Sequence, residues 1–162
     1  MVEIITYRLS VTGIWQYDFR LDGALFGKVS FTVSASEPVR IEKSPDLSWY
    51  SRFDLDTEII PGTSRRVKSN KTGNEVFRIV WWRQDLYEVR AGEKSVFAEI
   101  RNGNYLFGLP RMPVTAMTER ARGDSILIRG MEAESCFRTT FFEPVSTEYM
   151  MMVLSFPALR FC

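Results

Sequence analysis

The chain contains no histidine, so the side chain that serves most often as a general base in enzymes is missing. Its two cysteines, Cys136 and Cys162, have no neighbours at the spacings that metal sites use. No Gly-x-Ser-x-Gly motif marks a nucleophile. Gly103 and Gly108 have the spacing of a phosphate-binding loop, but Leu109 follows where that loop needs a lysine. We therefore expect neither an enzyme nor a cofactor.

The chain also lacks an excess of charge of either sign, because its 21 basic residues nearly balance its 20 acidic residues and the net charge is +1. Such a balance gives no field over the whole molecule that would attract a nucleic acid, and we expect none as a partner. A local basic patch remains able to bind an anion.

Long apolar runs are absent too. The best candidate, Tyr149 to Phe161, is shorter than the roughly 20 residues that span a bilayer, and Ser155, Pro157 and Arg160 interrupt it. The N-terminal residues show no basic region followed by an apolar stretch, as a signal peptide would. We expect a cytoplasmic protein with reduced cysteines, able to associate peripherally with a membrane.

The residues that are present predict one well-filled domain over 1–162. Hydrophobic residues make up 45% of the chain and aromatic residues 14%, which excludes a disordered polypeptide. At this length a domain buries about 70% of the surface that its unfolded chain exposes, so a core forms without disulfides or metal.

Apolar and polar residues alternate along most of the chain, with the period of two that is typical of β-strands. In the first such segment Ile5, Tyr7, Leu9 and Val11 are expected on one face. Asp22 and Gly23 then predict a tight turn between two strands. Hairpins of the same design occur at 66–82 and 86–101, and further strands are expected at 38–43, 47–53, 104–108, 113–118, 125–130 and 136–143.

The C-terminal segment breaks this pattern and predicts a helix over about 147–156. Ser146 or Thr147 can cap its first turn, Glu148 suits the positive end of the helix dipole, and Pro157 should end or kink it. The helix has no polar face, so we expect it to lie buried inside the sheet. Its apolar residues are Tyr149, Met150, Met151, Met152, Val153, Leu154 and Phe156.

A many-stranded sheet followed by an apolar helix resembles the tubby-like superfamily, which includes the tubby domain, the LURP-one-related proteins and the phospholipid scramblases. The tail from Leu154 to Phe161 and the hairpin at 71–76 are similar to those of small bacterial members. This resemblance implies a mainly β fold, in which a closed antiparallel barrel of about twelve strands surrounds the helix. It also implies a non-enzymatic binding or scaffold module, because the tubby domain binds phosphoinositides through basic barrel residues.

Four basic residues, Arg65, Arg66, Lys68 and Lys71, cluster before and within one predicted turn. Together they predict a site for the anionic head group of a phospholipid, to which each contributes about 1 kcal/mol near an anionic membrane. The same cluster can instead be a solvated strand edge that discourages edge-to-edge pairing. A second basic group, in a later irregular region, comprises Arg111, Arg120 and Arg122.

Two further functions remain open at this point. A barrel rich in aromatic residues can hold a small apolar ligand in an open lumen, although Trp81, Trp82 and the methionines at 150–152 are expected in the core. A hydrolase could use paired carboxylates on one strand face, and the candidates are Asp54 with Asp56 and Glu132 with Glu134.

Overall fold

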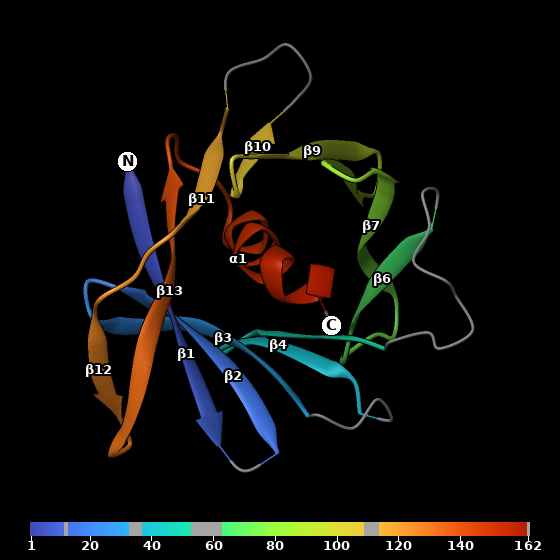
Figure 1. Ribbon diagram of the computed structural model, residues 1–162. Helices are drawn as coiled ribbons and strands as arrows, with labels where there is room; N and C mark the ends of the chain where they lie inside the picture. Colours follow the sequence, from blue (N-terminus) through green and yellow to red (C-terminus); the bar gives the residue numbers. More distant parts are fainter. Residues whose placement is uncertain (12, 33–36, 53–62, 109–113, 162) are drawn as a thin grey trace.

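Antiparallel strands wind around a single helix in a computed structural model of the chain, which describes residues 1–11, 13–32, 37–52, 63–108 and 114–161 (Figure 1). Within these residues the strands are β1 (Val2–Val11), β2 (Ile14–Leu21), β3 (Ala24–Thr32), β4 (Val39–Lys43), β5 (Leu47–Ser51), β6 (Ser64–Ser69), β7 (Glu75–Arg83), β8 (Leu86–Ala91), β9 (Lys94–Arg101), β10 (Asn104–Gly108), β11 (Ala116–Arg120), β12 (Ser125–Ile128) and β13 (Met131–Phe141). The helix is α1 (Thr147–Phe161).

The described strands form a closed barrel. Strands β1 to β11 pair in chain order, β11 pairs with β13, and β13 pairs with β1, so twelve strands complete the ring. Strand β12 lies outside the ring and pairs with the beginning of β13. The expected barrel of about twelve strands is therefore confirmed. Closure leaves no unpaired edge along the ring itself.

Tight turns connect many of the strands, as expected. Asp22 and Gly23 both have positive φ, 50° and 83°, which suits a two-residue hairpin between β2 and β3. The hairpins β6–β7 and β8–β9 match the units predicted at 66–82 and 86–101.

The face of the first strand that was expected to carry Ile5, Tyr7 and Leu9 is its outer face. Ile4 and Thr6 are buried against the barrel core, whereas Tyr7 and Leu9 join a smaller apolar cluster with β12 and β13. The β1–β13 ladder is irregular here, because Thr6 pairs with Phe137 but Tyr7 already pairs with Ser135. The extra residue in β13, Cys136, exchanges the faces of β13 beyond that point, so Ala133 joins Tyr7 and Leu9 in the outer cluster.

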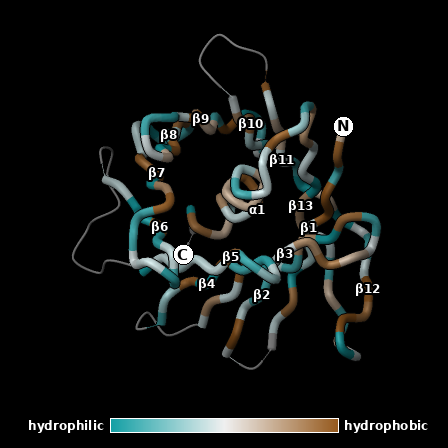
Figure 2. Tube along the Cα trace, turned by 180° about the vertical axis from the view of Figure 1, so that it is seen from behind, coloured by the Kyte–Doolittle hydropathy of each residue, from teal (hydrophilic) through white to brown (hydrophobic). Residues whose placement is uncertain are grey.

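Helix α1 lies in the lumen of the barrel, as the view from behind also shows (Figures 1 and 2). The Oγ of Ser146 accepts a hydrogen bond from the backbone N–H of Tyr149 at 3.2 Å, which makes Ser146 the N-cap. The residues from Met151 to Leu159 are all buried. The predicted central apolar helix is therefore confirmed.

Of the two expectations for Pro157, that it ends the helix or kinks it, the first is wrong, because the helix continues to Phe161. A proline within a helix removes one backbone hydrogen bond and crowds the preceding turn. In this chain the surrounding strands pack against the helix beyond Pro157, with Ala158 and Leu159 buried, and that packing favours one more turn.

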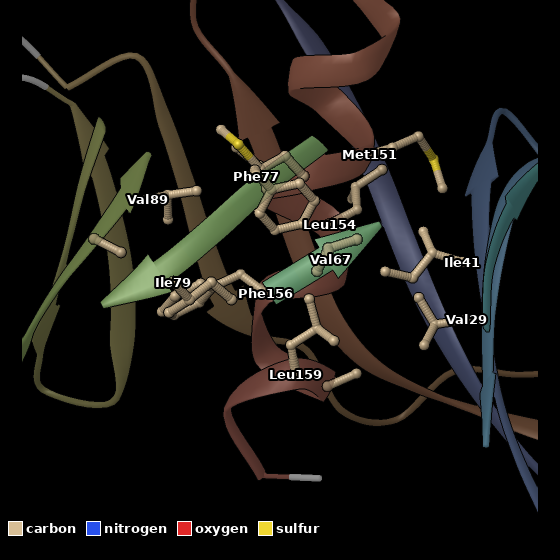
Figure 3. Packing of buried hydrophobic residues seen from close by; sticks show 14 of the residues in the cluster. Val29, Ile41, Val67, Phe77, Ile79, Val89, Met151, Leu154, Phe156 and Leu159 are labelled. Atoms are coloured by element: carbon tan, nitrogen blue, oxygen red, sulfur yellow. The ribbon is translucent and has the colours of Figure 1, made fainter. Parts of the chain in front are cut away.

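Side chains of the helix and of the strands meet in one continuous core (Figure 3). The ring of Phe156 makes edge contacts with Tyr87, Tyr105 and Phe107, at centroid distances of 5.3, 5.7 and 5.5 Å. Because α1 occupies the lumen, the barrel of described strands has no open lumen in which to hold an apolar ligand, and that alternative function is not supported.

The last turn of the helix is anchored to the barrel wall by Arg160. Its Nε and Nη1 donate hydrogen bonds to the hydroxyl groups of Tyr87 and Tyr105, at 3.1 and 3.0 Å. A positive charge at this position also complements the negative end of the helix dipole.

Within the described residues, no helix is long and apolar enough to cross a bilayer.

Candidate functional site

The structure separates Arg65 from the other three residues of the predicted basic cluster. Its Nη1 donates a hydrogen bond to the carbonyl oxygen of Leu159 at 2.7 Å, and its Nε donates one to the Oγ of Ser51 at 2.8 Å. Arg65 therefore points into the barrel and holds the carboxyl end of α1, where it satisfies a helix carbonyl that has no partner within the helix.

Arg66 and Lys68 lie on the opposite, outward face of β6, because successive residues of a strand alternate between faces. In the ladder between β6 and β7, Arg66 is paired with Arg78, and in the ladder between β7 and β8, Arg78 is paired with Arg90. Three arginines thus stand side by side on neighbouring strands. We call Arg66, Arg78 and Arg90 the arginine row.

Like charges directly opposite each other destabilise a sheet, so the arginine row needs counter-charges. Glu75 supplies one: its Oε1 accepts hydrogen bonds from the Nε and Nη2 of Arg78, at 3.1 and 2.9 Å, and lies 3.5 Å from the Nε of Arg66. Glu88 supplies the other and binds Arg90 at 2.8 and 3.1 Å. With Lys68 included, four cations face two carboxylates, which leaves the surface positive.

An exposed aromatic side chain borders the arginine row. Trp82 is 44% exposed, and the guanidinium carbon of Arg90 lies 5.8 Å from the centre of its ring. The indole N–H donates a hydrogen bond to Glu88 at 3.0 Å, which fixes the ring on the outer face. The expectation of a core position therefore holds for half-buried Trp81, which stacks on Tyr87, but not for Trp82.

A shallow groove of about 490 Å³ lies on the same outer surface, over β4 and β5. Tyr50 forms part of its wall and pairs across the ladder with Lys68, which connects the groove to β6. Two arginines, Arg40 and Arg52, line the groove with Glu37 and Glu42. We call the arginine row, Lys68 and Trp82 the outer basic face, and the groove adjoins it.

Lys71 is exposed in the turn between β6 and β7, at one end of the outer basic face. The predicted cluster therefore contributes Arg66 and Lys68 to this face, Lys71 to its edge, and Arg65 to the interior. The sequence alone did not identify Arg78 and Arg90, because these residues lie beside Arg66 only through the pairing of β6, β7 and β8. A repeated Arg at mid-strand positions of consecutive hairpins is the signal that could have found them.

The other predicted positions lie elsewhere. Glu132 and Glu134 share one face of β13, as expected, at the end of the barrel near Arg120 and Arg122. Asp54, Asp56, Arg111 and Cys162 fall outside the residues that the structure describes. Cys136 is a free thiol, and burial raises its pKa to about 12, so it is protonated and unreactive near neutral pH.

Comparison of the chain with models of protein families, with curated proteins and with solved structures finds no match in any of the three. The outer basic face is therefore interpreted from its own chemistry. Guanidinium groups bind phosphate and carboxylate oxygens in pairs, and an indole ring favours a boundary between apolar and aqueous surroundings.

Proposed function

We propose that the protein is a non-enzymatic binding module of tubby-like fold, whose outer basic face recognises the anionic head groups of phospholipids. The observation that supports this most is the arginine row, in which cations are placed on three adjacent strands in spite of their mutual repulsion. The tubby-like tail, from Leu154 to Phe161, supports the same function by resemblance.

The surface has the two kinds of group that a lipid interface engages. Basic side chains near an anionic membrane each contribute about 1 kcal/mol, and Arg66, Lys68 and Arg78 are all on the outward side of the barrel. Trp82 has an exposed ring that can enter the head-group layer, where tryptophan is enriched. Peripheral association at a membrane follows from this arrangement.

The proposal predicts binding to vesicles of phosphatidylcholine that contain phosphatidylserine, and none to vesicles of phosphatidylcholine alone. Replacing Arg66, Lys68 and Arg78 together by glutamine should weaken binding by about 100-fold, since three contributions of about 1 kcal/mol are lost. Co-sedimentation measures the bound fraction. Salt should reduce it, because screening shortens the range of these interactions.

A matched control carries glutamine at Lys94, Arg101 and Arg129, which lie on other exposed parts of the barrel. Both triple variants lower the net charge from +1 by 3, to −2. The control should keep its binding if position matters more than total charge. Equal losses in the two variants, or no binding of the unchanged protein at low salt, would contradict the proposal.

A further inference from the structure

A second hollow lies at one end of the barrel, where β11, β12 and the beginning of β13 meet β1 and β2. Its volume is about 680 Å³, within the range of sites for small molecules. We call it the end groove. Its charged and aromatic lining residues are Arg8, Tyr17, Arg120, Arg122, Asp124, Glu132, Glu134 and Phe137.

Strand pairing shows how these groups are arranged. Strand β13 lies between β1 and β11, so Arg8 on β1 and Arg120 on β11 flank it from two sides. Glu134 of β13 is paired with Arg8, and Phe137 is paired with Arg120. Neighbouring strands are about 4.8 Å apart, and Glu134 and Phe137 lie three residues apart along β13, so the two arginines are roughly 12–14 Å apart at their backbones. Side chains of that length can converge on one anion between them.

Opposite charges in the end groove do not neutralise one another directly. In the described part of the chain, no ion pair within 4.0 Å joins Arg8, Arg120 or Arg122 to Glu132 or Glu134. The guanidinium group of Arg8 instead lies over the ring of Trp15, 5.5 Å from its centre. Donors and acceptors of both signs therefore remain available to a ligand.

Two aromatic side chains give the end groove an apolar part. Tyr17 and Phe137 are half-buried and line its wall. Each is held by a second ring, Tyr17 by Phe31 at 6.2 Å and Phe137 by Tyr105 at 6.3 Å between centroids. The apolar part is thus fixed in place before any ligand arrives, which lowers the entropic cost of binding.

We propose that the end groove binds an α-amino acid with an apolar side chain. The ligand's carboxylate accepts hydrogen bonds from Arg8 and Arg120, its ammonium group donates to Glu134, and its side chain packs against Tyr17 and Phe137. A ligand with both charges fits better than a simple anion, because Glu134 stands beside Arg8 and repels a second negative charge. A simple cation is also disfavoured, because Arg8 and Arg120 repel its positive charge.

This site is independent of the proposed lipid-binding function. The end groove uses β1, β2, β11, β12 and β13, whereas the outer basic face lies on β6, β7 and β8. Loss of either activity therefore leaves the other unchanged, and the two proposals fail separately.

L-Phenylalanine is the probe, and the measurement is the change of backbone amide chemical shifts of the ¹⁵N-labelled protein, up to about 10 mM ligand. We expect saturable shifts at residues of the end groove. Two analogues serve as chemical controls: 3-phenylpropionate lacks the ammonium group, and 2-phenylethylamine lacks the carboxylate. Each should bind about tenfold more weakly or worse, because one charge-assisted hydrogen-bonding group is missing.

Arg120→Gln and Glu134→Gln should each weaken binding of L-phenylalanine by about tenfold or more. Glu93→Gln, in the exposed turn before β9, and Lys94→Gln, at the exposed first residue of β9, are their matched controls and should bind as the unchanged protein does. The proposal is overturned by an absence of shifts, by shifts of equal size with either analogue, or by groove variants that behave like the controls.

Discussion

Glu88 illustrates how strongly one side chain can depend on its neighbours. It lies on the outer face of β8, yet it is only 7% exposed. Its carboxylate accepts hydrogen bonds from Arg90, from the hydroxyl of Ser95 at 2.7 Å and from the indole N–H of Trp82 at 3.0 Å. The hydrogen bonds from Arg90 are the largest cause that lowers its pKa to about 2, against the opposing effect of burial.

This lowered pKa predicts how stability depends on pH. A carboxylate that is more acidic in the folded state stabilises the protein above its pKa in the unfolded chain, about 4.3. The stabilisation is lost as pH falls from there through about 2. Glu88→Gln should therefore be less stable than the unchanged protein at pH 7, by about 1–3 kcal/mol, and should lose less stability on acidification.

Urea unfolding at a series of pH values measures both effects. Glu93→Gln, in an exposed turn, is the control and should follow the unchanged protein at every pH. If the unfolding free energy of Glu88→Gln fell with pH in parallel with that of the unchanged protein, the carboxylate of Glu88 would not titrate at low pH as inferred.

Arg65 and Arg66 show what a sequence can and cannot reveal at this scale. The local composition indicates a basic cluster, and Arg66 and Lys68 do lie on the surface. Alternation around the apolar residue Val67 places Arg65 on the inner face of β6, so the direction of Arg65 could be predicted from the sequence. Its hydrogen-bond partner, the carbonyl oxygen of Leu159, lies far along the chain and could not be predicted.

At the scale of secondary structure, the period of two predicted most strands because each strand has one face toward α1 and one toward solvent. In β1 the alternation holds, but the face with Tyr7 and Leu9 packs outside the barrel against β12 and β13, which depends on strands far along the chain. The helix was recognisable because its apolar residues surround the axis. Its continuation through Pro157 depends on packing against strands and could not be read from local propensity.

The fit between α1 and the wall can be tested at Gly27 of β3. A Cβ atom there would lie 2.7 Å from both the Sδ and the Cε of buried Met151, and 3.1 Å from the carbonyl oxygen of Glu42. Gly27→Ala should cost about 1–3 kcal/mol of unfolding free energy, as overpacked cores do. Denaturant titration measures the cost.

Combining Gly27→Ala with Met151→Ala provides the control. Met151→Ala alone should cost about 2–5 kcal/mol because it leaves a cavity. In the double variant the new methyl group enters space that the methionine has vacated, so the combined cost should be smaller than the sum. Additive costs would mean that the two residues do not compete for the same volume.

At the scale of the whole molecule, the barrel has no core without its helix. Nine consecutive residues of α1, from Met151 to Leu159, are buried, and strands from all around the ring pack against them. Each large apolar side chain contributes roughly 1.5–3 kcal/mol on burial, which is a large part of the stability of one domain.

Deletion of residues 147–162 should therefore give an unfolded or insoluble chain, because the inner faces of the strands would be exposed to water. Circular dichroism and the soluble fraction after expression measure the outcome. Ser146→Ala, which removes only the N-cap, is the control and should cost about 1 kcal/mol while the protein stays folded. A truncated protein that remains soluble and unfolds cooperatively would contradict this account of the core.

The pairing of β1 with β13 also determines when the barrel can close during synthesis. Ile4 pairs with Thr139, about 135 residues later, and α1 follows only after that strand. At a ribosomal rate of about 5–20 residues per second, β1 waits roughly 7–27 s for its partner. Through that interval the nascent chain presents an open strand edge and an unfilled interior. Protection by chaperones at the ribosome therefore matters more for this chain than for one whose early segments fold by themselves.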